Sequence, residues 1–268
     1  GQSLIWKWKM TISEMIRNSD KDNMFQVLAD SYSQTDFEFA SDKEFEKINI
    51  EGIRNIIISG LGGSAIGGEL LVELLGTKLK YPCIINRNYT LPSYAGKETL
   101  FIASSYSGNT IETITSLKAA EIKKCRIICM TTGGEIEKIT AGKYPLIKLK
   151  PGFQPRFALY NNLFGLIRIF SALKLADMDS NLLNRIKNNM QSRSREYSAE
   201  SNYALETAEK LLGFIPVVYG VSGITSAAAG RLKAQFNENS KIHSFHNNYP
   251  ELDHNEIIGW EATSEQLF

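Results

Sequence analysis

The chain has 268 residues, of which 43% are hydrophobic and 22% are charged. This composition is typical of a soluble globular protein, and the length fits one large domain or two modest ones. The 30 basic residues balance 29 acidic ones to a formal net charge of +1, so we expect neither nucleic acid nor a membrane as a partner, and no apolar stretch approaches the roughly 20 residues of a membrane span.

Residues 1–45 indicate an N-terminal helical segment with polar breaks. The apolar core of its start, "GQSLIWKWKM", is too short for a signal peptide. We hypothesise that residues 1–9 are a non-native leader and that the natural start is Met10.

Short apolar runs that are rich in β-branched residues then alternate with helical patterns. The predicted strands cover residues 55–60, 81–87, 99–105, 125–132 and 144–150. This alternation predicts a parallel sheet that is covered by helices on both faces. Residues 157–213 are mostly helical in pattern, and a strand, a glycine turn, a helix and a second strand follow, with the strands at 215–223 and 241–247.

The later strand–glycine–helix unit resembles the earlier one, so the chain is predicted to contain two similar α/β halves. The second half shows only two strands. We expect that a C-terminal segment is absent from this chain, because an open two-stranded unit would leave strand edges and helix faces unpaired.

The three cysteines, Cys83, Cys125 and Cys129, lack the spacing of a zinc site. Cys83 and Cys125 lie in apolar strand-like runs, so we expect buried free thiols and a reducing, cytoplasmic compartment.

Hydroxyl side chains follow two of the predicted strands. In a parallel sheet, ligands bind beyond the carboxyl ends of the strands, where helix N-termini favour anions. The sequence "SSYSGNT" has no Lys and is no Walker A loop, and "GLGGSAIGG" departs from the dinucleotide fingerprint. We predict that the two turns converge on one phosphate monoester; the candidate ligands are Gly63, Ser64, Ser105, Ser107 and Thr110. The alternative is that these hydroxyls only cap their own helices.

With these residues assembled, the chain resembles the sugar isomerase (SIS) domain family. The resemblance covers roughly residues 50–260 and extends to the bifunctional phosphoglucose/phosphomannose isomerases. It rests on the motifs "SSYSGNTIET", "GLGGSAIGGELL", "PRFAL", "RLKAQFNENSK" and "YPELDHNEIIGW".

The resemblance implies a division into domains and an assembly. It implies an α/β fold with two SIS (flavodoxin-like) domains, each a parallel sheet flanked by helices. The first would span 46–155 and the second, incomplete at its C-terminus, 213–268, with linking helices at 156–212. It also implies a homodimer with shared active sites. The family has a Lys close to its C-terminus for which this chain shows no counterpart.

The resemblance also implies a reaction without metal or cofactor. Glucose 6-phosphate, and mannose 6-phosphate, would be interconverted with fructose 6-phosphate through an enediolate. By motif, Glu238 would be the base, Arg156 would lie near the C1–C2 oxygens, and His254, supplied by the other subunit, would open the sugar ring. These residue types suit proton transfer and stabilisation of the enediolate charge.

Two alternatives to this enzyme stay open. One is a non-catalytic SIS regulator that binds sugar phosphates and needs only the hydroxyl turns. The other is an isomerase that acts on another phosphosugar, such as an amino sugar or a pentose phosphate.

Overall fold

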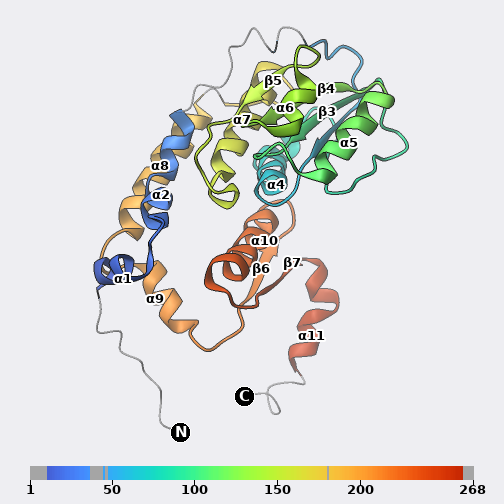
Figure 1. The fold of residues 1–268 in the computed structure, drawn as a ribbon. Helices are drawn as coiled ribbons and strands as arrows, with labels where there is room; N and C mark the ends of the chain where they lie inside the picture. Colours follow the sequence, from blue (N-terminus) through green and yellow to red (C-terminus); the bar gives the residue numbers. More distant parts are fainter. Residues whose placement is uncertain (1–10, 37–44, 46–47, 180, 262–268) are drawn as a thin grey trace. The chain divides into compact units, whose positions relative to one another are not determined.

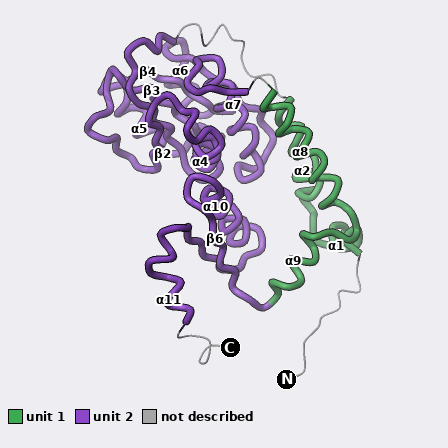
Figure 2. The backbone as a smooth tube through the Cα atoms, turned by 180° about the vertical axis from the view of Figure 1, so that it is seen from behind, with its two compact units in different colours: residues 1–36, 180–212 green, residues 37–179, 213–268 purple. Residues whose placement is uncertain are grey.

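The computed structural model describes residues 11–36, 45, 48–179 and 181–261, so the proposed leader 1–9 lies outside the described residues. The chain forms two compact units, drawn in different colours in Figure 2. One unit is formed by residues 1–36 and 180–212, and the other by residues 37–179 and 213–268. Each unit joins segments that lie far apart in the sequence.

The larger unit is built on a five-stranded parallel sheet in the order β2-β1-β3-β4-β5 (Figure 1). Its strands are β1 (Asn55–Ser59), β2 (Cys83–Asn86), β3 (Thr99–Ser104), β4 (Arg126–Thr131) and β5 (Leu146–Lys148). Its helices are α4 (Gly63–Leu75), α5 (Ile111–Ile122), α6 (Gly134–Thr140), α7 (Leu159–Ala172) and the short 3-10 helices η2 (Gly76–Lys78) and η3 (Pro155–Phe157). The predicted parallel α/β fold is confirmed.

The sheet is buried on both faces, as continuous apolar strands require. Ile57, Phe101 and Leu117 belong to a core between the sheet and the helices α5 and α6. On the other face α4 lies so close that a Cβ atom on Gly68 would approach the side chain of Ile85 to 2.8 Å. Helix α7, with fully buried Phe164, packs against α4.

A second, smaller sheet in the same unit contains two parallel strands, β6 (Val217–Val221) and β7 (Phe245–Tyr249), with α10 (Ser226–Gln235) between them in the sequence. Helix α10 covers one face, where a Cβ atom on Gly220 would contact Ala229 at 2.9 Å. Val217 and Val221, on the other face, are each 40% exposed. The π-helix η4 (Phe236–Ser240), the 3-10 helix η5 (Glu251–His254) and α11 (Glu256–Glu261) complete the unit.

The strand predicted at 241–247 begins later than expected, and this prediction was wrong by four residues at its start. The helical segment continues to Ser240, and Lys241 ends it with a positive φ of 58°. The chain then needs several residues to return to the sheet, where Phe245 donates its backbone amide to the carbonyl of Pro216.

The smaller unit contains helices only, within the described residues. These are α1 (Ile12–Ser19), α2 (Met24–Ala29), η1 (Ser31–Asp36), α8 (Leu182–Tyr197) and α9 (Tyr203–Lys210). Helix α1 begins with a capping box between Thr11 and Glu14. An ion pair between Lys187 and Asp36 joins α8 to η1.

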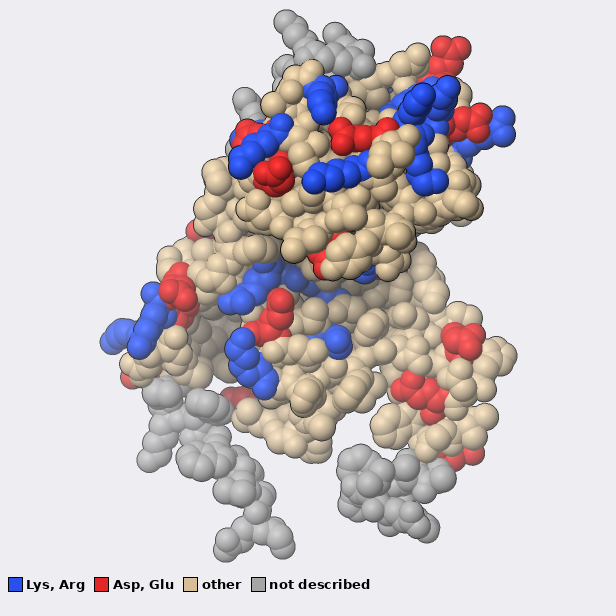
Figure 3. Space-filling view, turned by 45° about the vertical axis from the view of Figure 1, so that its right-hand side comes forward, with Lys and Arg blue, Asp and Glu red and all other residues tan. Residues whose placement is uncertain are grey.

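The described residues form no helix that is both long and apolar enough to cross a membrane. Over the upper part of the face drawn in Figure 3, Lys and Arg side chains are interspersed with Asp and Glu. This mixture agrees with the near-zero net charge of the chain.

Candidate functional site

The two hydroxyl-rich turns lie side by side at the carboxyl edge of the sheet. Strands β1 and β3 are hydrogen-bonded neighbours, with Ser59 opposite Ala103 at their ends. The chain runs from β1 through α4 to β2 on one side of β1, whereas β3 lies on its other side. This is the topological switch point of the sheet, where open α/β folds bind their ligands.

The hydroxyl groups of these turns do not cap the helices that follow them. Helix α4 has Gly62 at its N-cap and α5 has Thr110, and neither helix receives a side-chain cap hydrogen bond. Both helices begin at this edge of the sheet, so the positive ends of their dipoles lie at the switch point. The alternative that these residues serve only as caps of their own helices is thus excluded.

The second turn is folded on its own hydroxyls. The Ser105 hydroxyl accepts from the Gly108 amide at 3.2 Å and pairs with the Thr110 hydroxyl at 2.9 Å. The Ser107 hydroxyl accepts from the Asn109 amide at 3.2 Å. These bonds fix the turn in a tight curl with the hydroxyls of Ser105, Ser107 and Thr110 close together.

One buried amide connects the two turns. Asn162, on α7, donates from Nδ2 to Ser104 Oγ at 2.6 Å and to Ser64 Oγ at 3.4 Å. Both serines and Asn162 are buried, with at most 8% of any of them exposed. A Cβ atom on Gly60 would lie 2.7 Å from the Ser104 carbonyl oxygen. Ser64 and the start of the second turn therefore lie within reach of a single small ligand.

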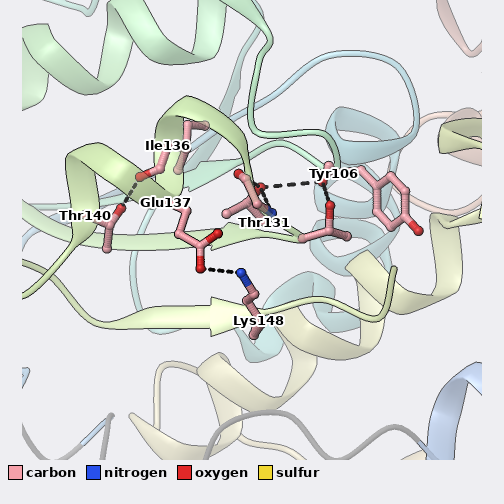
Figure 4. A network of polar contacts seen from close by, with 8 residues as sticks. Tyr106, Thr131, Ile136, Glu137, Thr140 and Lys148 are labelled. Atoms are coloured by element: carbon pink, nitrogen blue, oxygen red, sulfur yellow. Dashed lines mark hydrogen bonds and ion pairs between the residues drawn. The ribbon is translucent and has the colours of Figure 1, made fainter. Parts of the chain in front are cut away.

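The rear of the second turn is fixed to the ends of β4 and α6, as Figure 4 shows for the carbonyl of Tyr106. That carbonyl accepts from the hydroxyls of Thr131 and Thr132, at 3.4 and 2.7 Å. Asn109 uses its side-chain oxygen to accept from the Glu135 amide at 3.0 Å, so it caps α6 rather than α5. The turn is consequently held from behind by groups that leave its donors in front.

The phenol of Tyr106 links the same turn to the segment that carries Arg156. It donates to the carbonyl of Lys150 at 3.0 Å and accepts from the amide of Phe153 at 2.9 Å. Burial raises the pKa of Tyr106, although its hydrogen bond from Phe153 opposes the shift. The segment then enters η3, where a Cβ atom on Gly63 would lie 3.1 Å from the Pro155 carbonyl oxygen.

Arg156 is therefore next to the first residue of α4. Its guanidinium lies 5.3 Å from the ring centre of Phe157. Its Nε atom is buried and has no hydrogen-bond partner among the described residues. The backbone of Arg156 thus lies between the β1 turn and α10.

Glu238 lies in the π-helical turn that continues α10, and it is exposed. A π-helical turn redirects side chains and is frequent at functional sites. The link from Glu238 to the rest of the site is Arg231, whose guanidinium interacts electrostatically with the Glu238 carboxylate. Arg231 also donates a hydrogen bond to the backbone carbonyl of Arg156.

His254 is placed differently from the other candidates. It ends η5, beyond β7, and it is exposed. Within the described part of the chain, no hydrogen bond or ion pair joins it to Glu238, to Arg156 or to the hydroxyl turns. The described residues also contain no group of three or more His, Cys, Asp or Glu side chains that could hold a metal ion.

Sequence reasoning missed three residues that organise this site, namely Tyr106, Asn162 and Arg231. Tyr106 and Arg231 lie inside quoted motifs, "SSYSGNT" and "RLKAQFNENSK". Nothing in the sequence marks Asn162, because a polar residue on an otherwise apolar helix has no visible partner until the helix is packed.

The fold and the switch-point turns define an α/β protein of the phosphosugar isomerase type. The fold is similar to that of the solved tagatose-6-phosphate ketose/aldose isomerase from Escherichia coli, with a TM-score of 0.57 and 16% identity over 91% of this chain and 66% of that chain. Residues 200–267 match the model of the bacterial phospho-glucose isomerase C-terminal SIS domain.

Two curated relatives are more similar in sequence. The bifunctional phosphoglucose/phosphomannose isomerase of Caldicellulosiruptor bescii is 40% identical over 82% of this chain and 66% of its own length. The enzyme of the same name from Aquifex aeolicus is 30% identical over 89% of this chain and 70% of its own length. The chain belongs to the family of bifunctional phosphoglucose/phosphomannose isomerases, and it spans about two thirds of the length of these relatives.

Proposed function

We propose that the protein catalyses the reversible isomerisation of glucose 6-phosphate, and of mannose 6-phosphate, with fructose 6-phosphate. The observation that carries this proposal is the meeting of two uncapped, donor-rich helix starts at one switch point, next to Arg156. The names of the curated relatives support the same reaction.

The phosphate group would bind at the two turns. The amides at the start of α4 and α5, with the hydroxyls of Ser64, Ser105, Ser107 and Thr110, would donate to its oxygens. Gly63 would let the phosphate approach the backbone. Because the turns carry no Lys, the helix ends would supply the positive potential.

The sugar would extend from the phosphate toward Arg156 and α10. Glu238 would take the proton from C2 of the open-chain aldose and return it to C1, while the O2 proton passes to O1. The Arg156 guanidinium would stabilise the enediolate oxygens. Because C2 is planar in that intermediate, the glucose and mannose configurations share it.

His254 would open the sugar ring, and it would do so in the site of a second subunit. Its exposure at the end of η5, outside the hydroxyl turns, supports a role in trans. The proposal therefore includes a homodimer with shared sites. It also keeps the division into a first SIS domain at 46–155 and a partial second one at 213–268.

The test is a coupled assay on the purified gene product. Glucose 6-phosphate, mannose 6-phosphate, an amino-sugar phosphate and a pentose phosphate would be compared as substrates. We expect turnover of the two hexose phosphates, loss of turnover in Glu238→Gln, and nearly unchanged phosphosugar binding by calorimetry. Glu209→Gln, an exposed carboxylate change on α9, is the control.

Each other outcome points to an alternative. Binding without turnover in the parent protein would indicate a sugar-phosphate regulator. Turnover of only the amino-sugar or pentose phosphate would indicate a different isomerase. A Glu238→Gln variant as fast as the parent would assign the base to another residue.

A further inference from the structure

Arg231, on α10, contacts two groups, one on η3 and one on its own helix. Its guanidinium donates to the backbone carbonyl of Arg156. The amide group of Gln235 lies against the guanidinium of Arg231. Gln235 lies one helical turn further along the same face of α10. Arg231 is therefore a fixed connection between α10 and η3.

The electrostatic environment of Arg231 points to the site. Burial lowers the pKa of Arg231, and the nearby Glu238 carboxylate and the Tyr160 side chain oppose that shift. Burial raises the pKa of Tyr160, in the first turn of α7, and the charge of Arg231 opposes part of this shift. The half-buried guanidinium of Arg231 thus contacts the backbone of the neighbouring loop, and the exposed Glu238 lies within the range of its charge.

We propose that Arg231 is a positioning residue that holds the backbone of Arg156 against α10, the helix whose π-helical continuation carries Glu238. This inference rests on the proposed function, because it assigns Arg156 to the enediolate oxygens and Glu238 to the proton. Arg231 itself contacts the main chain of Arg156, which leaves the Arg156 side chain free to face substrate.

The physical reason is the geometry of the guanidinium fork. A planar fork with several donors binds a backbone carbonyl in a fixed direction, whereas an ammonium group acts as a single point charge. The segment from Phe153 to Arg156 is also fixed at its start by Tyr106 and through the contact of Pro155 with Gly63. Arg231 adds the direct hydrogen bond from α10 to the backbone of Arg156 itself.

The test compares kinetics and two binding probes in the purified gene product. One probe is a hexitol 6-phosphate, which has no carbonyl and reports phosphate binding. The other is the hydroxamate of a five-carbon phosphorylated sugar acid, which mimics the planar enediolate. Arg231→Gln should lower kcat by about 10- to 100-fold, as expected for a misplacement of catalytic groups by about 1 Å.

The same variant should weaken hydroxamate binding by a comparable factor. The KM and the hexitol phosphate affinity should change by less than about twofold, because only interactions made in the transition state are lost. Arg231→Lys should recover little of kcat because it keeps the charge but lacks the fork. Lys233→Gln, which removes a charge two residues along α10, is the matched control and should behave like the parent.

Thermal unfolding of each variant shows whether the fold is intact. If Arg231→Gln does not fold, Arg231→Lys is tested with the same assays in its place. An unchanged kcat in the folded variant, or equal losses of hydroxamate and hexitol phosphate binding, would overturn the inference alone. A parent protein without turnover of any hexose phosphate would overturn the proposed function, and this inference with it.

Discussion

The carboxylate of Glu73 accepts a hydrogen bond from the hydroxyl of Ser226, so the last turn of α4 holds the first residue of α10. The same carboxylate accepts from the Ala227 amide at 3.0 Å. Glu73 therefore caps α10 from a neighbouring helix, and its negative charge lies at the positive end of that helix. The helix that follows the first hydroxyl turn is thereby joined to the helix that leads to Glu238.

Glu73→Leu should lower the free energy of unfolding by about 1–2 kcal/mol, because it removes two charge-assisted hydrogen bonds. Glu69→Leu is the control, one turn earlier on α4, where the carboxylate forms an ion pair with Arg87 at 2.7 Å between half-exposed side chains. Such a pair contributes less than about 1 kcal/mol. Urea unfolding measures both; equal losses would contradict the cap.

Asn162→Leu should weaken the binding of hexose 6-phosphate, since the Ser64 and Ser104 hydroxyls would lose the amide that orients them. Asn161→Leu is the matched control on the same helix. Its amide is also buried but donates to the carbonyl of Lys150. We expect both variants to lose about 1–3 kcal/mol of stability, and only Asn162→Leu to lose affinity in calorimetry. A similar loss of affinity in both would refute the orienting role.

Gly108→Ala should disrupt the second hydroxyl turn. Gly108 has a φ of +71°, and a Cβ atom there would lie 2.6 Å from Thr131 Oγ1 and would overlap the Gly133 carbonyl oxygen. Gly142 has nearly the same φ, +73°, but open space around it. Gly142→Ala should therefore cost only the left-handed conformation, about 1–2 kcal/mol. Gly108→Ala should unfold at a lower temperature than this control, and it should bind the phosphosugar more weakly.

The stability of the protein should fall between about pH 9 and pH 11. Burial raises the pKa of Cys129 from 9.0 to about 11, and this thiol is fully buried. In that window the unfolded chain loses the proton while the folded chain keeps it, so the free energy of unfolding decreases as the pH rises. Each pKa unit of difference between the folded and unfolded states corresponds to about 1.4 kcal/mol in the free energy of unfolding.

Cys129→Ala isolates this contribution. The variant will be less stable at every pH because it leaves a cavity. The slope of its free energy of unfolding against pH should be smaller than that of the parent, by up to the equivalent of one proton. Urea unfolding at pH 8 and pH 10 measures the difference. Parallel curves for the two proteins would show that Cys129 ionises equally in the folded and unfolded states.

The sequence by itself determined the strands and their class. The apolar runs at 55–60 and 99–105 became β1 and β3 with boundaries within one residue, because a strand buried on both faces leaves a continuous apolar signal. The hydroxyl turns were also found, since glycine and serine clusters after such strands mark the ligand edge of a parallel sheet. For β7 the prediction failed, because a π-helical turn carries no periodic signal of its own.

Only the tertiary structure decided what holds the site together. Three contacts join residues that are 50 or more positions apart in the sequence. They are made by Asn162, Arg231 and Glu73. A hydrogen bond of this kind depends on the positions of both partners, and neither side chain announces the other in the sequence. Local pattern is therefore enough to place the hydroxyl turns, whereas the contact of α10 with the backbone of Arg156 is a property of the packed helices.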